Sequence, residues 1–336
     1  MTDAPTELCV LGAGSWGTAL AVQFARAGHP TRLWGHIAAE QRAMAAARCN
    51  QLFLPGVTFP SALTVHEDLA AAIRGVNDLL IAVPSHALRE VLSRLEPLLE
   101  TGARLAWATK GFELDTGLLP HQVARAVLGS ERAMAVLSGP TFAKEVGAGL
   151  PTAMTVASSN ADFANDLALR ISSDNFRAYT SSDIVGVEVG GATKNVLAVG
   201  AGLADGLGFG ANTRVALITR GLAEMTRLGI ALGAQRETFM GLAGLGDLVL
   251  TCTDDQSRNR RFGKLLAKGT DVVLALKEIG QVVEGYMAAK AVYRVAQHHQ
   301  VEMPICEGIY QMLHENLPPQ EVVRGLMSRP IRPEFD

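Results

Sequence analysis

The sequence predicts an α/β fold in two parts: a doubly wound, mainly parallel β-sheet in the first half and a second, mostly α-helical domain. Short apolar runs alternate with helical patterns from residue 8 to about residue 180, as in successive βαβ units. Strand signals fade beyond Ser181, and long helical patterns follow. A length of 336 residues also exceeds what one hydrophobic core usually holds. We therefore expect domains of residues 1–184 and 185–336.

The expected strands are short apolar runs bounded by polar residues or glycine. They cover residues 8–11, 31–34, 78–83, 104–109, 133–137, 153–157 and 176–179. Leucine and valine repeat at helical spacing over residues 86–99, which predicts a helix there. The other expected helices cover residues 18–27, 184–203, 213–228, 258–268 and 284–298. The last residues, 328–336, contain two prolines and are expected to form a loose tail.

A glycine-rich turn joins the first strand to the first helix. Gly12, Gly14 and Gly17 form the pattern G-x-G-x-x-G directly after the apolar run. In such a turn the first glycine permits a tight bend, the second lets backbone amides approach a pyrophosphate, and the third lets the helix pack closely on the strand. The helix N-terminus adds unpaired N–H groups and a positive dipole end. The turn predicts a Rossmann-type dinucleotide site, with an ordinary tight loop as the alternative.

The second strand ends without the acidic residue that would select NAD strictly. Gly35 and His36 follow it, and the first carboxylate, Glu40, lies inside the next helical pattern. Nothing there would repel a ribose 2′-phosphate, and His36 with Arg32 or Arg42 could attract one. We therefore expect NADP to be accepted as well as NAD. The alternative is that Arg32 and His36 are solvated surface side chains.

Composition argues against several classes of function. The formal net charge of −3 provides no broad basic field, which disfavours nucleic-acid binding. Four scattered cysteines, Cys9, Cys49, Cys252 and Cys306, indicate neither a metal site nor a disulfide framework, so we expect free, buried thiols. The N-terminus is polar, and no apolar stretch of about 20 residues is uninterrupted. We therefore expect a cytoplasmic protein without stable membrane insertion.

Three segments place polar or cationic residues after strands, where α/β proteins bind their ligands. The first is Val83-Pro84-Ser85, the second ends in Lys110-Gly111, and the third begins Ser138-Gly139-Pro140-Thr141. Each alone is an ordinary strand-to-helix loop. Their recurrence in one domain favours a site, with Lys110 as its leading cation and a surface lysine as the alternative.

In the second half, Lys194 is the leading candidate for acid–base chemistry. It lies in a stretch rich in glycine and alanine, residues 187–197, which permits close approach of a neighbouring domain or ligand. Loss of hydration and a nearby cation both lower the pKa of a lysine toward neutrality, as a general acid for carbonyl reduction requires. Asp247, after Gly246, is placed to orient a lysine or a substrate hydroxyl. The alternative is a lysine that extends from a buried helix to water.

A cluster of basic residues suggests an anion site. Ser257 is a plausible N-cap, which puts Arg258 and Asn259 in the first turn of a helix. The helix dipole disfavours a cation there, so Arg258 indicates an anion shared between its guanidinium and backbone N–H groups. One alternative is a solvated basic face paired with Asp254 and Asp255. The other, an RNA-contacting patch, lacks the interleaved aromatic residues that such patches use.

Taken in order, these segments resemble bacterial NAD(P)-dependent glycerol-3-phosphate dehydrogenases over nearly the whole chain. The most specific motifs are GAGSWGTAL (12–20), ATKG (108–111), SGPTFA (138–143), GGATKN (190–195), LGDL (245–248), QSRNR (256–260) and GQVVEG (280–285). The resemblance implies reversible hydride transfer between a nicotinamide and C2 of dihydroxyacetone phosphate, without a metal. The product, sn-glycerol 3-phosphate, supplies phospholipid synthesis. Lys194 would be the general acid for reduction and the general base for oxidation.

The resemblance also implies roles for the other candidate residues. Lys110 and Asn195 would hold and polarise the carbonyl, and Asp247 would orient Lys194. The substrate phosphate would be received by Arg258, Asn259, Gly139, Thr141 and Ser257. The cofactor would contact Gly12, Gly14, Ser15, Trp16, Gly17, His36, Lys110, Ala143, Arg258, Val282 and Glu284.

Two other functions stay open at the level of sequence. One is another hydroxyacid or sugar-phosphate dehydrogenase with the same two-domain plan. The other is a dinucleotide sensor without catalysis, which would give Lys194 and Arg258 no role. Formation of a homodimer through the helical half is also open.

Overall fold

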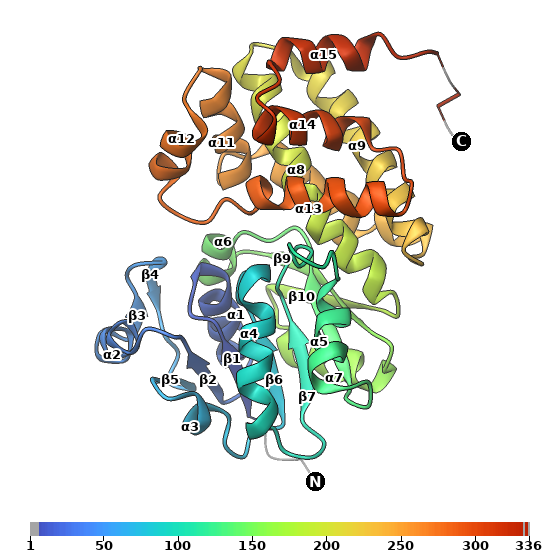
Figure 1. Cartoon of the computed structure of the whole chain (residues 1–336). Coiled ribbons are helices and arrows are strands. Elements are labelled where there is room, and N and C mark those ends of the chain that lie inside the picture. The colour runs from blue at the N-terminus through green and yellow to red at the C-terminus, as the bar shows by residue number, and fades with distance from the viewer. Residues whose placement is uncertain (1–6, 332, 335–336) are drawn as a thin grey trace.

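The computed structural model, which describes residues 7–331 and 333–334, confirms the predicted α/β fold (Figure 1). An eight-stranded sheet has the order β10-β9-β8-β7-β6-β1-β2-β5. Its neighbouring strands are parallel except β8 and β9, which pair antiparallel. The strands are β1 (Leu8–Leu11), β2 (Thr31–Trp34), β5 (Leu63–His66), β6 (Asp78–Ile81), β7 (Arg104–Trp107), β8 (Met134–Ser138), β9 (Thr152–Ser158) and β10 (Phe176–Ser181).

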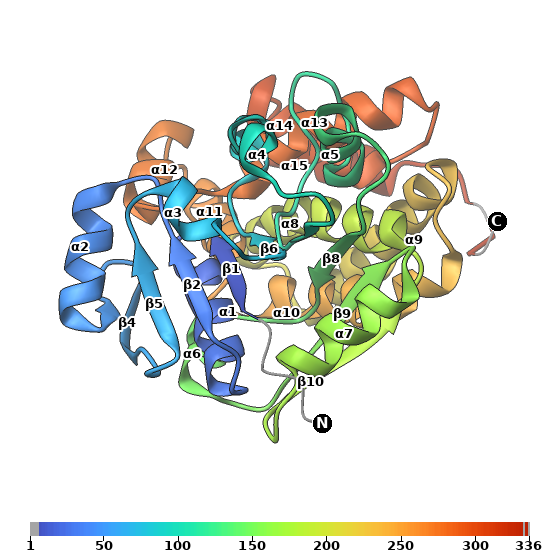
Figure 2. The same ribbon diagram turned by 90° about the horizontal axis from the view of Figure 1, so that it is seen from below.

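Helices cover both faces of the sheet, as the view in Figure 2 makes plain. Helices α1 (Ser15–Arg26), α6 (Ala143–Ala148) and α7 (Ala161–Ile171) contribute to one apolar core. Helices α3 (Leu69–Ile73), α4 (Ser85–Leu95) and α5 (Pro120–Leu128) contribute to the core on the opposite face. Alternate residues of each buried strand enter one core or the other, which explains why strands such as β1 are continuous apolar runs.

Three parts of the N-terminal half were not predicted in this form. The strand β5 was not expected, since only two of its four residues are apolar. The helical pattern expected around Glu40 is α2 (Ala38–Ala47), but the small hairpin of β3 (Cys49–Asn50) and β4 (Leu54–Thr58) that follows it was not predicted. The helix expected over residues 86–99 ends early, at Leu95, and a 3₁₀ turn, η1 (Glu96–Leu98), follows. Pro97 lies in that turn, and a proline has no N–H with which to continue the α-helix.

The second half is helical, and α8 (Ile184–Gly206) is buried along most of its length at the centre of it. Helix α13 (Glu284–His298) has the predicted bounds, and α9 (Ala211–Ala231) and α11 (Arg258–Ala267) lie close to theirs. Further elements not predicted are η2 (Arg236–Met240), η3 (Leu242–Gly246), α10 (Asp247–Thr253), α12 (Val272–Ile279), α14 (Pro304–His314) and α15 (Pro319–Met327).

Helix α8 also connects the two halves of the molecule. It packs against α9, α10, α11, α13 and α14, and it contacts β8 and β9 of the sheet. A Cβ atom at Gly202 would lie 1.9 Å from the carbonyl oxygen of Arg260, so this glycine permits α11 to approach the backbone of α8. Ile184 and Val187, in the first turn of α8, belong to a core of the sheet. The start of α8 therefore packs with the N-terminal half. The boundary between the two domains at residues 184 and 185 stays a prediction.

The cysteines are free thiols, and three of the four are buried. All four cysteines are free; Cys9, Cys252 and Cys306 are buried as expected, whereas Cys49 is partly exposed. Burial raises the pKa of the Cys9 and Cys252 thiols to about 12, so neither is a reactive thiolate near neutral pH. Within the described residues, none of the helices combines the length and apolar character needed to span a membrane.

Candidate active site at the junction of sheet and buried helix

The glycine turn has the geometry expected of a phosphate-binding loop. Gly12 has a φ of 118°, and a Cβ there would lie 2.7 Å from the carbonyl oxygen of Ala82. A Cβ at Gly17 would lie 1.8 Å from the carbonyl oxygen of Gly12, so only glycine permits this close packing. Nothing lies within 4 Å of a Cβ built at Gly14, which therefore borders open space. No described side chain caps α1, so its first N–H groups fit an anionic ligand.

Asn50 supports this turn, and sequence reasoning missed it. Its Nδ2 donates to the carbonyl oxygen of Ala13 at 2.9 Å and to Thr18 Oγ1 at 2.8 Å. Its Oδ1 accepts from the backbone N–H of Phe53 at 3.0 Å. Asn50 lies in the two-residue strand β3, which is too short to give a periodic signal. The hairpin thus fixes the turn from a segment that the sequence pattern did not identify.

The three basic residues expected near the end of β2 differ in their surroundings. Arg32 donates to both carboxylate oxygens of Glu7 at 2.7 Å, and its Nη1 donates to backbone carbonyls of the segment 71–74. These bonds occupy the guanidinium within the protein. Arg42 forms an exposed ion pair with Glu67 at 2.6 Å. His36 is exposed directly after the strand. His36 and Arg42 are thus more accessible to a ligand than Arg32 is.

Two lysines from distant parts of the chain share one carboxylate. Lys194 Nζ on α8 donates to Asp247 Oδ1 and also to Thr251 Oγ1, the latter at 3.0 Å. Lys110 Nζ, three residues beyond β7, donates to Asp247 Oδ2 at 2.7 Å. The Asp247 side chain is 1% exposed, so this cluster is removed from water. The contact between Asp247 and a lysine, expected from sequence, is present twice.

Burial and charge set the protonation of this cluster. Burial lowers the pKa of Lys194 to about 8; Asp247 opposes the shift and the charge of Lys110 adds to it. Burial alone would raise the pKa of Asp247, but Lys110 and Lys194 more than offset this, and the carboxyl pKa is below its ordinary value. Asp247 is therefore an anion across the neutral range, while Lys194 exchanges its proton just above it. This is the behaviour expected of a general acid.

Thr251 was not predicted as part of the cluster. It lies four residues after Asp247, on the same face of α10, and its hydroxyl donates to the carbonyl oxygen of Asp247 at 2.6 Å. The i, i+4 spacing within a helix is the signal that could have identified it. The threonine oxygen gives the Lys194 ammonium group a second acceptor beside the carboxylate.

Beside the lysines, α11 begins as the sequence predicts. Ser257 Oγ accepts from the backbone N–H of Arg260 at 3.2 Å, which makes Ser257 the N-cap. Asp255 pairs with Arg260 and with Lys264, but Arg260 is buried, so the alternative of a solvated, paired basic face fits Lys264 and not Arg260. Arg258 forms no ion pair with any described residue; its Nη1 lies 3.4 Å from the side-chain oxygen of Gln281.

A chain of amide and carboxylate groups joins α8, α11 and α13. Asn259 Nδ2 donates to Asn195 Oδ1 at 2.9 Å, and Asn195 Nδ2 donates to Glu284 Oε2 at 2.8 Å. Asn259 Oδ1 accepts from the backbone N–H of Gly285 at 2.8 Å. Asn195 directly follows Lys194, so these bonds place the start of α11 beside the buried lysine. Val282, in contrast, is 48% exposed and joins none of these bonds.

The loop after β8 completes the arrangement. Gly139 has a φ of 155°, and a Cβ there would lie 2.9 Å from Met154 Cα. Thr141 Oγ1 donates to the carbonyl oxygen of Gly139 at 3.2 Å, and Ala143 begins α6. From α6, Glu145 Oε1 accepts from Gln256 Nε2 at 2.7 Å, which joins the sheet side to the segment before α11. Helix α6, which follows the loop, therefore contacts the segment before α11.

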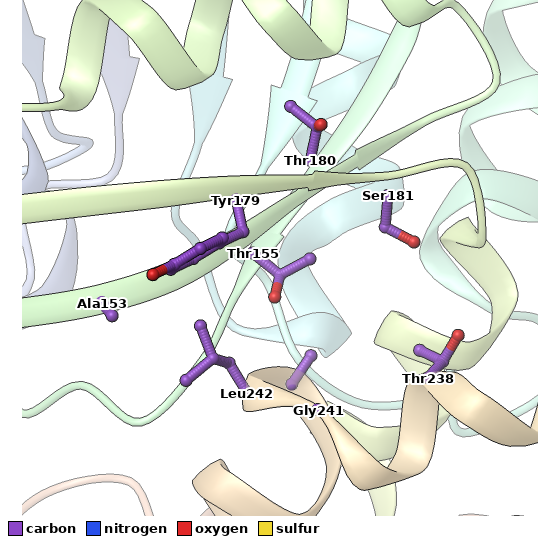
Figure 3. A pocket seen from close by; sticks show the side chains of 9 residues that line it. Ala153, Thr155, Tyr179, Thr180, Ser181, Thr238, Gly241 and Leu242 are labelled. Atoms are coloured by element: carbon purple, nitrogen blue, oxygen red, sulfur yellow. The ribbon is translucent and has the colours of Figure 1, made fainter.

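A separate cavity of about 500 Å³ lies between strands β9 and β10 and the segment that follows α9 (Figure 3). Its lining residues are Ala153, Thr155, Tyr179, Thr180, Ser181, Thr238, Gly241, Leu242 and Ala243. None of these residues was predicted for the site, and the lining carries no charged side chain. Lys110, Lys194 and Asp247 are not among the lining residues.

Comparison with known proteins shows the family of this chain. Models of the N-terminus and C-terminus of NAD-dependent glycerol-3-phosphate dehydrogenase match residues 7–164 and 183–324. A glycerol-3-phosphate dehydrogenase (NAD(P)+) of Aeromonas hydrophila is 57% identical over 96% of this chain and 97% of its own length. The corresponding protein of Shewanella baltica strain OS185 is 56% identical over 96% of both chains.

Solved structures show the same similarity. The crystal structure of glycerol-3-phosphate dehydrogenase from Coxiella burnetii superposes with a TM-score of 0.94 at 47% identity, covering 97% of this chain and 99% of that one. D-mandelate dehydrogenase, in a ternary structure with NADH, superposes with a TM-score of 0.63 at 12% identity, covering 92% of this chain and 97% of that one, and shares the fold alone. On the family-model matches and the sequence identities, this chain belongs to the NAD-dependent glycerol-3-phosphate dehydrogenase family.

Proposed function

We propose that this protein reduces dihydroxyacetone phosphate to sn-glycerol 3-phosphate with NADH or NADPH and catalyses the reverse oxidation. The observation that carries the proposal is the buried Lys194, which shares the carboxylate of Asp247 with Lys110 beside the N-terminus of α11. It combines a proton donor of suitable pKa with an adjacent anion site. The names of relatives 55–57% identical to this chain specify the same reaction for those proteins.

Lys194 is the residue that we assign to proton transfer. When bound, the nicotinamide supplies hydride to C2 in reduction and accepts it in oxidation. In reduction Lys194 Nζ gives a proton to the C2 oxygen as the C=O bond becomes an alcohol; in oxidation it removes that proton. Lys110 and Asn195 hold and polarise the carbonyl oxygen, and the developing negative charge is stabilised by the two ammonium groups. Asp247 orients both lysines, at 2.7 Å from the Nζ of Lys110.

The start of α11 is the site that we assign to the substrate phosphate. Arg258 supplies a guanidinium that forms no ion pair with a described residue, and Asn259 and Ser257 lie in the same turn. We also assign Gly139 and Thr141, in the loop after β8, to the binding of this phosphate. A phosphate placed there would satisfy a cation that the helix dipole otherwise disfavours. Binding energy from this remote group would hold C2 beside Lys194.

The glycine turn is the site that we assign to the cofactor pyrophosphate. Gly14 leaves room for it, and the backbone N–H groups of Ser15, Trp16 and Gly17 open α1. The indole Nε1 of Trp16 is buried and has no partner among the described residues, so it is one more donor for a ligand. The further contacts that we assign to the cofactor come from Gly12, His36, Lys110, Ala143, Arg258, Val282 and Glu284.

We also propose that the protein works in the cytoplasm and that its partner is a small phosphorylated substrate. Its four cysteines are free, which fits a reducing compartment. The product supplies the glycerol phosphate backbone of phospholipids.

A substrate panel tests the function. Oxidation of NADH and of NADPH is followed by absorbance with dihydroxyacetone phosphate, with unphosphorylated dihydroxyacetone and with other phosphorylated and hydroxyacid-forming ketones. We expect turnover with dihydroxyacetone phosphate by both cofactors and little with the unphosphorylated ketone. Preferred turnover of another ketone would assign a different dehydrogenase activity. Cofactor binding without turnover of any ketone would assign a sensor.

A further inference from the structure

Glu188, in α8, is a buried carboxylate that the proposed chemistry does not use. It is 3% exposed. Its Oε1 accepts from the indole Nε1 of Trp107 at 2.8 Å and from the backbone N–H of His121 at 2.9 Å. Its Oε2 lies 2.5 Å from Nδ1 of His121. Trp107 ends β7 and His121 lies in the first turn of α5, so one carboxylate connects α8 to two elements of the sheet domain.

The bonds of Glu188 fix a register between α8 and the segment that carries Lys110. Trp107 contacts Glu188, and three residues further along both segments Lys110 passes over Gly191. A Cβ at Gly191 would lie 3.3 Å from Lys110 Cγ, so the lysine stem lies against the helix backbone there. Three residues beyond Gly191 is Lys194, which meets Lys110 at Asp247. Positions 188 and 191 lie on one face of the helix.

Burial of an ionisable side chain in an apolar interior is energetically unfavourable. Burial raises the pKa of Glu188, because the charged form loses hydration; the bonds from His121 and Trp107 only partly oppose this. An apolar side chain of similar size would avoid that cost if packing were its only task. The three bonds instead fix direction and distance, which apolar contacts do not. This favours a role in geometry.

We propose that Glu188 is a positioning residue that sets the separation of the Lys110 and Lys194 ammonium groups across Asp247. The proposal rests on the proposed function, in which those two lysines act on one carbonyl oxygen. Glu188 acts through Trp107 and the three residues that follow it. The carboxylate itself touches neither lysine in any contact of the described residues.

A shift of Lys110 relative to α8 would change the pKa of Lys194, which a general loss of stability would not do. The titratable groups that act on Lys194 are Asp247 on α10, Lys110 after β7, Glu284 on α13 and the neighbouring thiol of Cys252. Of these, Lys110 lowers the pKa of Lys194 and Asp247 raises it. If Lys110 moves away, Lys194 loses a repelling charge and a competitor for Asp247. Its pKa then rises, and the alkaline limb of the reduction profile moves to higher pH.

The experiment compares variants of the full-length protein, after the wild type has shown turnover of dihydroxyacetone phosphate. Glu188→Met removes all three acceptor contacts at similar volume, and Glu188→Gln keeps one side-chain oxygen for Trp107 and the His121 backbone. Trp107→Phe removes the indole donor and, because Trp107 is fully buried, also some packing volume at the end of β7. Glu224→Gln is the matched control, because Glu224 is another buried carboxylate, on α9, that accepts from the backbone of α14 far along the chain from Lys110.

For Glu188→Met we expect kcat of reduction to fall about tenfold or more, with an alkaline limb ~0.5 pH unit or more higher than in the wild type. Trp107→Phe should shift the limb in the same direction, and Glu188→Gln should restore most of both. A normal limb in both Glu188→Met and Trp107→Phe, whatever the change in stability, would overturn the proposal, and Glu224→Gln should leave the limb unchanged. If Glu188→Met does not fold, Trp107→Phe alone decides. Absence of turnover in the wild type would instead refute the proposed function.

Discussion

Lys110 Nζ donates to Asp247 Oδ2 at 2.7 Å across 137 residues of sequence. Lys110 follows a strand of the sheet, whereas Asp247 begins a helix of the second half, so neither half alone contains the charged cluster. The cluster also includes Lys194, whose low pKa depends partly on Lys110. The proposed acid–base chemistry thus depends on the assembled fold.

Replacing Lys194 by alanine tests its assignment as the general acid. We expect kcat for dihydroxyacetone phosphate reduction to fall about a hundredfold or more, the usual scale for loss of an acid–base group. Cofactor affinity, measured by quenching of NADPH fluorescence, should change little, because the glycine turn is untouched. A variant with near-normal turnover would refute this role for Lys194.

The pKa of Lys194 predicts how the two directions of reaction depend on pH. Burial lowers that pKa to about 8. Reduction needs the protonated lysine, so kcat of reduction should decline as pH rises through about 8. Oxidation needs the neutral lysine and should accelerate over the same interval. Measurement of kcat in both directions from neutral to alkaline pH checks this, and parallel profiles in the two directions would contradict it.

The elements that sequence predicts best are those whose signal is local. The strand β1 has four fully buried residues, since helices cover both faces, and its apolar run marks both ends correctly. The strand β5 is only partly buried, and its alternation of Leu63, Thr64, Val65 and His66 is too short to be recognised. The antiparallel direction of β9 depends on sheet assembly and has no local signal.

In the candidate site, too, the sequence predicts what has a local signal and misses what depends on the fold. Residue types identified Lys110, Lys194 and Asp247, and the N-cap at Ser257 followed from its position before a helical pattern. Their meeting at one carboxylate required the fold, because 53 and 137 residues separate the lysines from Asp247. Asn50 supports the glycine turn from a distant hairpin and therefore gave no signal near the turn.

Replacing Arg258 by alanine tests the phosphate assignment. Because a charge-assisted hydrogen bond would be lost, we expect the KM for dihydroxyacetone phosphate to rise about tenfold or more. Arg261→Ala is the matched control, since Arg261 is an exposed arginine on the same helix. The control should retain its KM. An effect of Arg258→Ala on the cofactor KM alone would reassign the residue to the dinucleotide.

Replacing Gly17 by alanine tests the dinucleotide turn. The new Cβ would lie 1.8 Å from the carbonyl oxygen of Gly12, so the turn must open. We expect NADH and NADPH to bind about tenfold or more weakly in calorimetric titrations, since the pyrophosphate loses aligned N–H donors. Gly28→Ala gives a comparison at the far end of α1, where a Cβ meets nothing within 4 Å but φ is +91°. It should strain the backbone and spare the affinity; unchanged affinity in Gly17→Ala would contradict the assignment.

Glu224 predicts a pH dependence of stability that is separate from catalysis. Burial raises its pKa from 4.5 to about 7, although the backbone N–H groups of Ile305 and Cys306 and the charge of Arg227 oppose the shift. The folded state therefore binds this proton more tightly than the unfolded state does. The resulting stability is fully present below about pH 4.5 and is lost as pH rises through about 7.

Comparison of wild type with Glu224→Gln isolates this contribution, because the amide does not titrate and still offers an oxygen to one of the two N–H groups. The free energy of unfolding is measured with urea at about pH 5 and about pH 8. Between these two pH values it should fall by a few kcal/mol more in the wild type than in the variant. The other titrating groups are common to both proteins. The difference between wild type and variant in the slope of unfolding free energy against pH therefore reports Glu224 alone. Equal slopes would show that Glu224 ionises in the folded protein as it does in the unfolded chain.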